Sequence, residues 1–406
     1  MSHLRTLAGR LRPLAEEITM GVLLPIFVCW TAIASFLPKE RNLWVFGPSG
    51  RGWFVDNSKY QFLHSARNTD KRCVWVSSDL DTSTAEQLRA RGYEAYHGDS
   101  WRGRYLTLRA ECVFLSYRPE AALKWFVTGS RTVQLWHGNP IKQLNAPTPS
   151  WNTYLSYSYL TRAYNTWTNF VVTAEGRVRR IYQERFSLAD DQILLTGYPR
   201  NDVLVRSVPD WDIGQESDIF EWASEESDQL AFYLPTWRGG GFSESHNPFH
   251  PDNFPLETVS SLLNEAGAHL LVKPHPNTDL PEGFEDTDRV VVLPDDLDIY
   301  PLLREVDVLV TDYSSILFDY LLVGNPIVLY PFDLEAYERE RGFYYDYRTE
   351  MPAPIAETPQ EFCEALRDAF DGRDDHREQR RELNAEVNEH GDGYAAERVV
   401  NAVLEW

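Results

Sequence analysis

The chain has little positive charge for its length, and very little lysine. Its 406 residues include 61 acidic and 39 basic side chains, a formal net charge of -22, and only six of the basic residues are lysines. A balance this acidic argues against general binding to nucleic acid. Many carboxylates and few lysines around a core of ordinary hydrophobicity favour adaptation to high salt, because concentrated salt screens repulsion within such a surface. An acidic protein from ordinary-salt surroundings is the alternative.

Cysteine is scarce as well. The four cysteines form neither a C-x-x-C pair nor a zinc-ligand spacing, and we predict no metal site and no cofactor. A disulfide framework is not expected in a chain of this size, so we predict reduced thiols in a cytoplasmic protein. The cysteines are Cys29, Cys73, Cys112 and Cys363.

One long uncharged run lies near the N-terminus, at residues 18–38. It is about long enough to cross a bilayer as a helix, although Pro25 would kink such a helix. It is also compatible with an anchor lying in the membrane interface, or with a signal peptide cleaved after Ala32-Ile33-Ala34. We favour a membrane anchor with the rest of the protein in the cytoplasm, because a strand-like run starts almost immediately, at Leu43.

After this segment, short apolar runs alternate with helical stretches, which predicts parallel βαβ units. The predicted helices include "STAEQLRARG" and "LETVSSLLNEAG", which stop at Gly92 and Gly267, and "SILFDYLLVG". One series runs from residue 39 and a second starts near residue 229, separated by an acidic stretch with turn residues. The pattern indicates an α/β protein with two doubly wound domains. The predicted segments are an anchor at 1–38, a first domain at 39–207, a second at 208–385, and a C-terminal helix at 386–406 that packs back toward the first domain.

Two motifs follow strands of the first domain. In "LWHGNPIKQL", His137 comes at the end of a strand, where it could accept a proton from a hydroxyl, and Gly138 permits close backbone approach. A histidine bonded to a loop carbonyl is an equal alternative. The second motif, "TGYPRND", has the composition of a turn near a cleft, through Gly197, Pro199 and Arg200.

Two further motifs follow strands of the second domain. Arg238 in "YLPTWRGGG" could bind a phosphate through its planar fork of donors, or lie on the surface beside a flexible glycine loop. Lys273 and His275 in "VKPHPN" flank a proline at the end of a buried strand. A cation or hydrogen-bond donor there would suit an anionic leaving group, although a core histidine is the alternative.

The segment "VTDYSS" gives the clearest physical signal. A strand ends there and a helix is predicted to begin among Thr311, Asp312, Ser314 and Ser315. Free backbone N–H groups at such a helix start, with nearby hydroxyls, form a site suited to a pyrophosphate. A plain helix cap with no ligand is the alternative.

A carboxylate pair occupies a later loop of the second domain. Asp333 and Glu335 begin a helix after the strand "PIVLY". Either carboxylate could contact a ribose hydroxyl, and a solvated acidic helix start is an equal interpretation.

Taken in order, these motifs resemble the CDP-glycerol glycerophosphotransferase family, whose members build teichoic-acid-like polymers. The resemblance rests on "LWHGNPIKQL", "GYPRND", "PTWRG", "KPHP", "TDYSSILFDYLLVGNPIVLYPFD" and "RGFYYDY", with "VDNSKY" earlier, and covers most of the chain from Lys39 onward. It implies a GT-B-type fold of two facing Rossmann-like domains. It also implies transfer of glycerol phosphate or another polyol phosphate from a CDP-linked donor, with release of CMP.

The resemblance further implies that His137 and His275 are catalytic. It predicts a lipid-linked glycan or polymer as acceptor and a location on the cytoplasmic face of the membrane. Asn139 stands where threonine is frequent in the family, and the glycine run after Arg238 is unusual. A GT-B glycosyltransferase using a nucleotide sugar, and a non-catalytic nucleotide- or polymer-binding relative, are the other hypotheses.

Overall fold

The computed structural model describes residues 29–405 except 31, 48–52, 79, 118–125, 145–167, 216, 226–228, 240–241, 243, 283 and 285. Most of the apolar segment at 18–38 therefore lies outside the described residues, although 29–30 and 32–35 are helical. Within the part of the chain that the structure describes, no helix is both long and apolar enough to span a membrane.

The first sheet has seven strands in the order β3-β2-β1-β4-β5-β6-β7. The registers given for its neighbouring strands, from β3 to β6, are all parallel. Apolar side chains fill both faces of β1 and β4, as is usual for parallel strands covered by helices on each side. The strands are β1 Glu40–Phe46, β2 Arg72–Ser77, β3 Glu94–His97, β4 Ala110–Leu115, β5 Arg131–Gln134, β6 Asn169–Val172 and β7 Ile193–Leu195.

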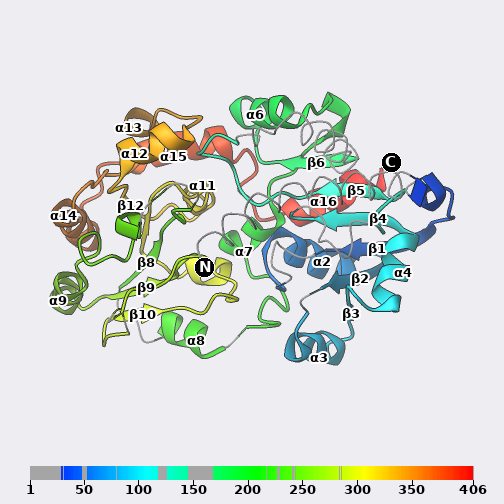
Figure 1. Ribbon diagram of the computed structural model, residues 1–406, viewed down its shortest axis with the longest axis horizontal. Coiled ribbons are helices and arrows are strands. Elements are labelled where there is room, and N and C mark those ends of the chain that lie inside the picture. The colour runs from blue at the N-terminus through cyan, green and yellow to red at the C-terminus, as the bar shows by residue number, and fades with distance from the viewer. Residues whose placement is uncertain are drawn as a thin grey trace, which may run out of the picture. The chain divides into compact units, whose positions relative to one another are not determined.

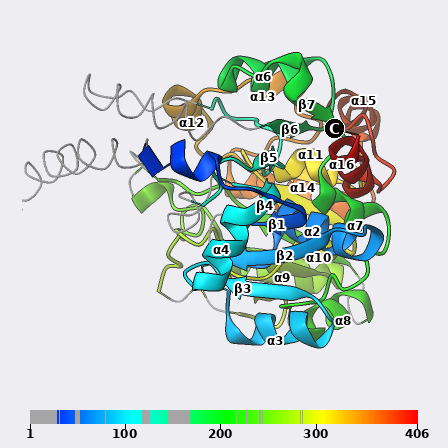
Figure 2. The same cartoon turned by 90° about the vertical axis from the view of Figure 1, so that its right-hand side faces the viewer.

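Helices connect the strands of this sheet, and α2 and α4 pack along β1, β2 and β4 (Figure 2). Helix α3 begins where the Asp81 carboxylate accepts a hydrogen bond from the Thr84 amide. The connecting elements are α2 Asp56–Asn68, α3 Thr82–Ala90, α4 Trp101–Arg109, α6 Arg177–Phe186 and the 3-10 helix η1 Asp190–Gln192.

The second sheet has five strands in the order β10-β9-β8-β11-β12, and all of its pairings are parallel. Helices α9 and α14 lie against it and close a core of aromatic and branched side chains (Figure 1). Helix α9 ends at Gly267, whose φ of 68° is left-handed, so the predicted glycine stop is confirmed. The strands are β8 Leu230–Leu234, β9 His269–Val272, β10 Val290–Val292, β11 Val308–Thr311 and β12 Ile327–Leu329.

The remaining helices follow or connect these strands. Helix α14 carries a capping box, in which Thr358 and Glu361 bond each other's backbone amides. The helices are η2 Pro199–Asn201, α7 Asp202–Val205, α8 Ser217–Glu225, η3 Glu244–His246, α9 Leu256–Ala266, α10 Tyr300–Leu303, α11 Ile316–Tyr320, α12 Leu334–Arg341, α13 Tyr347–Glu350, α14 Pro359–Phe370, α15 Arg377–Val387 and α16 Ala395–Leu404.

The chain forms two compact units. The first contains residues 1–136, 145–171 and 186–194, and the second contains 137–144, 172–185 and 195–406. The parallel α/β class predicted from the sequence is confirmed. The segment that carries His137 belongs to the second unit, together with the whole five-stranded sheet. The candidate site residues named above therefore all lie in this unit, whereas "VDNSKY" lies in the first.

Candidate active site

The strand order of the second sheet locates the site. In the order β10-β9-β8-β11-β12, the chain winds outward in one direction from β8 and in the other from β11. Ligands of doubly wound sheets bind outside the carboxyl ends of the strands at such a switch point. The segments that leave these two strands are "PTWR", after Leu234, and "DYSS", after Thr311. The motifs with the strongest chemical signals therefore flank the switch point.

Arg238 links these two segments, and its guanidinium is buried. Its Nε and Nη2 donate to the two oxygens of Asp333 at 2.8 and 2.9 Å, and its Nη1 donates to Asp312 at 2.7 Å. The Asp312 carboxylate also accepts from the Thr236 amide at 2.8 Å. These two carboxylates raise the pKa of Arg238 against the effect of its burial. Arg238 thus binds the loops after β8, β11 and β12 to one another.

Aromatic rings enclose this ion cluster. The Arg238 guanidinium lies 4.8 Å from the ring centre of Tyr313 and 5.1 Å from that of Tyr337. The Tyr313 hydroxyl donates to Asp333 at 2.9 Å, and burial raises the pKa of Tyr313 well above its usual range. Asp312, which we predicted near a donor phosphate, and Asp333, for which a ribose hydroxyl was one of two equal interpretations, therefore both have protein partners. Glu335 lies on the exposed first turn of α12.

The start of α11 holds the predicted phosphate-binding hydroxyls. Helix α11 has only five residues and is followed by turns, so it is shorter than the predicted helix through "SILFDYLLVG". The Thr311 hydroxyl donates to the Leu234 carbonyl at 2.7 Å and so ties β11 to β8. The Ser314 hydroxyl accepts a long bond of 3.4 Å from the Ile316 amide, and the Ser315 side chain makes no capping bond.

The loop of His137 lies against this helix start. A Cβ on Gly138 would be 2.5 Å from the Ser315 hydroxyl and 2.9 Å from an Arg200 nitrogen, so only glycine fits there, and its φ is 125°. The preceding residue, Trp136, has a φ of 59°, which is unusual for a bulky side chain. The structure therefore brings the loop that carries His137 next to Ser315 and Arg200, and His137 itself is partly exposed.

A second buried ion pair fixes the "GYPRND" motif to α11. The Arg200 guanidinium donates to Asp319 at 2.7 Å, and the Tyr300 hydroxyl donates to the same carboxylate oxygen at 2.8 Å. Asn201 donates to the other oxygen at 3.0 Å. Gly197 has a φ of 82°, and Pro199 begins η2. The motif thus forms a turn that leads into η2, and its arginine holds α11, the helix that follows Ser315.

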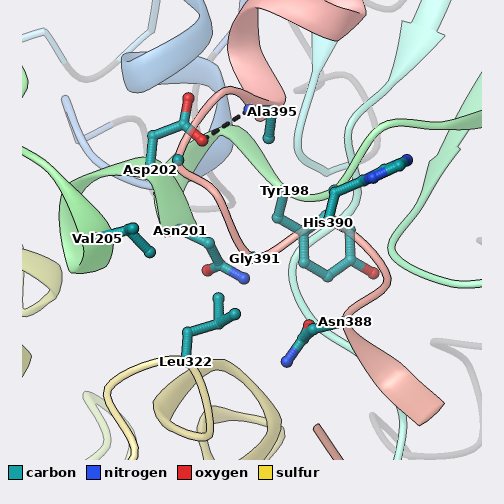
Figure 3. Close-up of a pocket in the computed structure, with 11 residues that line it drawn as sticks. Tyr198, Asn201, Asp202, Val205, Leu322, Asn388, His390, Gly391 and Ala395 are labelled. Carbon is teal, nitrogen blue, oxygen red and sulfur yellow. Dashed lines mark hydrogen bonds between the residues drawn. The ribbon is translucent and has the colours of Figure 1, made fainter. Parts of the chain in front are cut away.

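A small cavity lies on the other side of this turn (Figure 3). Tyr198, Asn201 and His390 are among its lining residues, and its volume of about 10 Å³ holds no more than one water molecule. Beside it, the Asp202 carboxylate accepts hydrogen bonds from the Ala395 and Ala396 amides at 2.8 and 3.0 Å. This region is a helix cap rather than a substrate site.

The "VKPHPN" loop leaves β9, the strand next to β8. The Lys273 ammonium donates to the carbonyls of Pro294 and Asp295 at 2.6 and 2.8 Å, and burial lowers its pKa to about 8. His275 is exposed, its Nδ1 accepts from the Asn277 amide at 3.1 Å, and its ring stacks on Trp237 at 5.6 Å. The structure thus places His275 on an exposed loop outside the strand end, and it places the Lys273 ammonium against the carbonyls of a neighbouring loop.

Trp237 also lines a larger cavity of about 330 Å³, with Arg238 and Asn277 among the other lining residues. This volume suits part of a small-molecule ligand. The Trp237 indole lines this cavity and also stacks on His275, which is not itself a lining residue. Trp237, Tyr313 and Asp319 are site residues that sequence reasoning missed, although all three stand inside quoted motifs.

Among the residues described, none form a group of three or more histidine, cysteine or carboxylate side chains able to hold a metal ion.

Two parallel sheets, with histidines and hydroxyls gathered outside a switch point, are typical of α/β enzymes that bind nucleotides at their strand ends. The family model described as CDP-glycerol:poly(glycerophosphate) glycerophosphotransferase matches residues 30–405. The chain belongs to this family, and it is accordingly a transferase of the glycerophosphotransferase class.

Individual relatives agree with this assignment. A teichoic acid glycerol-phosphate transferase of Staphylococcus aureus is 30% identical over 92% of this chain and 95% of its own length. A teichoic acid poly(ribitol-phosphate) polymerase of Bacillus spizizenii is 26% identical, and the chain spans about half of it, 52%. The structure of the wall teichoic acid polymerase TagF matches 98% of both chains with a TM-score of 0.71 at 19% identity, which shows the same fold.

Proposed function

We propose that this protein transfers glycerol phosphate, or a related polyol phosphate, from CDP-glycerol or its counterpart to a hydroxyl of a membrane-linked glycan or polymer, with release of CMP. The observation that carries the proposal is the near full-length match to a glycerol-phosphate transferase, at 30% identity. The motifs of the match gather at one switch point, which supports it independently.

The reaction is a substitution at phosphorus. The acceptor oxygen attacks the phosphorus that carries the polyol, a new P–O bond forms, and the bond from that phosphorus to the oxygen of CMP breaks. His137 takes the acceptor proton as general base. His275 stabilises the negative charge on the departing CMP. No electrons are exchanged with an external oxidant or reductant.

The surrounding residues position the phosphates. The hydroxyls of Ser314 and Ser315, at the start of α11, offer donors beside the His137 loop. Arg238 and Arg200 act in this proposal as positioning residues, since each is held by buried carboxylates. The cavity beside Trp237 receives part of the donor. The mechanism calls on side chains for charge stabilisation, and activity is predicted to persist in EDTA.

The proposal places the enzyme at the cytoplasmic face of a membrane, where a CDP-linked donor and a lipid-linked acceptor meet, and in a salt-rich cell. The uncharged run at 18–38 supports the membrane location, and the net charge of -22 supports the high salt.

A donor panel tests the function. The purified protein is incubated in molar salt with CDP-glycerol, CDP-ribitol, UDP-sugars and GDP-sugars, each with a membrane extract as acceptor, and nucleotide release is measured. CMP release from a CDP-polyol alone is expected, and the preferred polyol identifies the donor. Release of UDP, UMP or GDP would instead assign the protein to nucleotide-sugar enzymes.

A further inference from the structure

Lys142, in the same motif as His137, is held against the Arg238 cluster by backbone pairing. Lys142 and Phe343 form an isolated antiparallel bridge. The Gln143 amide donates to the Gly342 carbonyl at 3.0 Å, and the Tyr344 amide donates to the Ile141 carbonyl at 2.9 Å. The bridge joins the "HGNPIKQL" motif to "RGFYYDY", two motifs that are far apart in the sequence.

The partner strand of this bridge belongs to the aromatic cage of Arg238. The Phe343 ring lies 5.5 Å from that of Tyr313, on which the Arg238 guanidinium rests. Arg341, next to the bridge, donates to the Gly239 carbonyl at 2.8 Å and so holds the loop after Arg238. Lys142 therefore lies in the loop cluster outside the carboxyl ends of β8 and β11.

The charge of Lys142 is not balanced within this cluster. Asp312 and Asp333 are both paired with Arg238. The Lys142 ammonium makes no hydrogen bond or ion pair with any residue that the structure describes, although the side chain is partly buried. Burial lowers its pKa to about 8, Asp312 opposes this effect, and Arg238 and Arg341 add to it. A desolvated cation without a counter-ion destabilises a fold, and such local conflicts are concentrated at functional sites.

We propose that Lys142 is a donor-binding residue whose ammonium contacts a phosphate of the CDP-linked donor. This inference rests on the proposed function for the identity of the ligand, and it adds a residue to which no role was assigned. The phosphate supplies the counter-ion that Lys142 lacks in the folded protein. Donor binding therefore removes the unfavourable free energy of a desolvated, unpaired ammonium group. The contact strengthens donor binding and also aligns the phosphates with His137, which the same motif carries.

Nucleotide binding tests the assignment without any need for turnover. Affinities of CDP and of cytidine are measured by calorimetry for the wild type and for Lys142→Met, Lys142→Arg and Lys71→Met. Lys71 is a control that also removes one lysine, but from an ion pair with Glu111 in the first unit. A charged hydrogen bond of ordinary strength predicts that Lys142→Met weakens CDP binding by about ten- to a hundredfold.

The same variant should bind cytidine, which has no phosphate, as the wild type does. Lys142→Arg should recover most of the CDP affinity, and Lys71→Met should retain all of it. Without nucleotide, Lys142→Met should melt at the same temperature as the wild type or higher, because it removes an unbalanced charge. Unchanged CDP affinity in Lys142→Met, or an equal loss of CDP and cytidine affinity, would overturn the assignment. Failure of the wild type to release CMP from CDP-polyols would count against the proposed function, while the binding comparison would still decide the role of Lys142.

Discussion

At the scale of single residues, the site contains two kinds of side chain. Some are presented on loops outside the switch point, and others form buried ion pairs that hold these loops to one another. His137 and His275 are presented on loops, next to Ser315 and Trp237 respectively. Arg238, in contrast, has its donors occupied by buried carboxylates. Substitutions in the two groups should therefore have different consequences, the first in turnover and the second in stability.

His137 is expected to act on turnover. Replacing it by alanine removes the proposed general base, which contributes about 10² to 10⁴ in rate. The KM for the CDP-polyol should change little, because the base contacts the acceptor hydroxyl. Steady-state CMP release measures both quantities, and His376→Ala is the control, because the partly exposed His376 lies in none of the site motifs. A folded His137→Ala protein with wild-type turnover would exclude the proposed role.

Arg238 is expected to act on stability. Arg238→Met leaves Asp312 and Asp333 buried without their cation, and breaking such a pair costs about 3 to 5 kcal/mol of unfolding free energy. Arg348→Met is the matched control, because its pair with Glu357 is solvent-exposed and should contribute little to stability. Urea unfolding compares the two variants. Equal, small losses would show that Arg238 is not the structural centre described above.

At the scale of elements, the C-terminal helix α16 depends on one buried cap. Asp202 accepts both amides at the start of the helix, and Figure 3 shows it beside Ala395. Burial raises the pKa of this carboxyl to about 6, although the two amides act in the opposite direction. Its proton therefore leaves the unfolded chain at lower pH than it leaves the folded protein.

This pKa predicts a pH dependence of stability. The stabilisation from the protonated form is complete below the unfolded pKa, near 3.9, and is lost as the pH rises through about 6. The free energy of unfolding of the wild type, relative to Asp202→Asn, should therefore fall by about 2 kcal/mol between pH 4 and pH 7. Urea unfolding of both proteins across this range isolates the residue from other titrating groups. Parallel curves would refute the prediction.

Local sequence signals predicted the helices and strands more accurately than the contacts between distant side chains. Runs of branched apolar residues correctly predicted strands β8, β9 and β11, and α9 ends at Gly267 as predicted. The helix after "TDYSS" is shorter than expected, because the chain turns after Tyr320 toward Gly324, whose φ is 84°. The sequence indicated a phosphate as one possible partner of Arg238. Its partners in the structure, Asp312 and Asp333, are distant in the sequence, and residue pattern alone does not pair such positions. Lys142 was missed for the same reason, since it lies against Phe343.

At the scale of the whole molecule, charge is the dominant feature. The net charge of -22 predicts that the folded protein repels itself at low ionic strength. The predicted domain boundaries and membrane anchor stay predictions, and so does the adaptation to salt.

Salt should raise the stability of this protein. Between about 0.1 and 1 M KCl the Debye length falls from roughly 10 to 3 Å, so the urea midpoint should increase across this interval and then level off. A midpoint that is independent of KCl would contradict the salt-adaptation hypothesis. A rise that continues steadily above 1 M would indicate exclusion of salt from the surface instead of charge screening.

The reaction type is the central claim, and the fate of a single phosphorus tests it most directly. CDP-glycerol labelled with ³²P at the phosphorus that carries glycerol is incubated with the enzyme and a membrane acceptor, and the nucleotide product is separated by ion exchange. Attack at that phosphorus predicts unlabelled CMP, label in the acceptor fraction, and loss of both in His137→Ala. Labelled CDP would show that glycerol leaves without its phosphate, and would contradict the account.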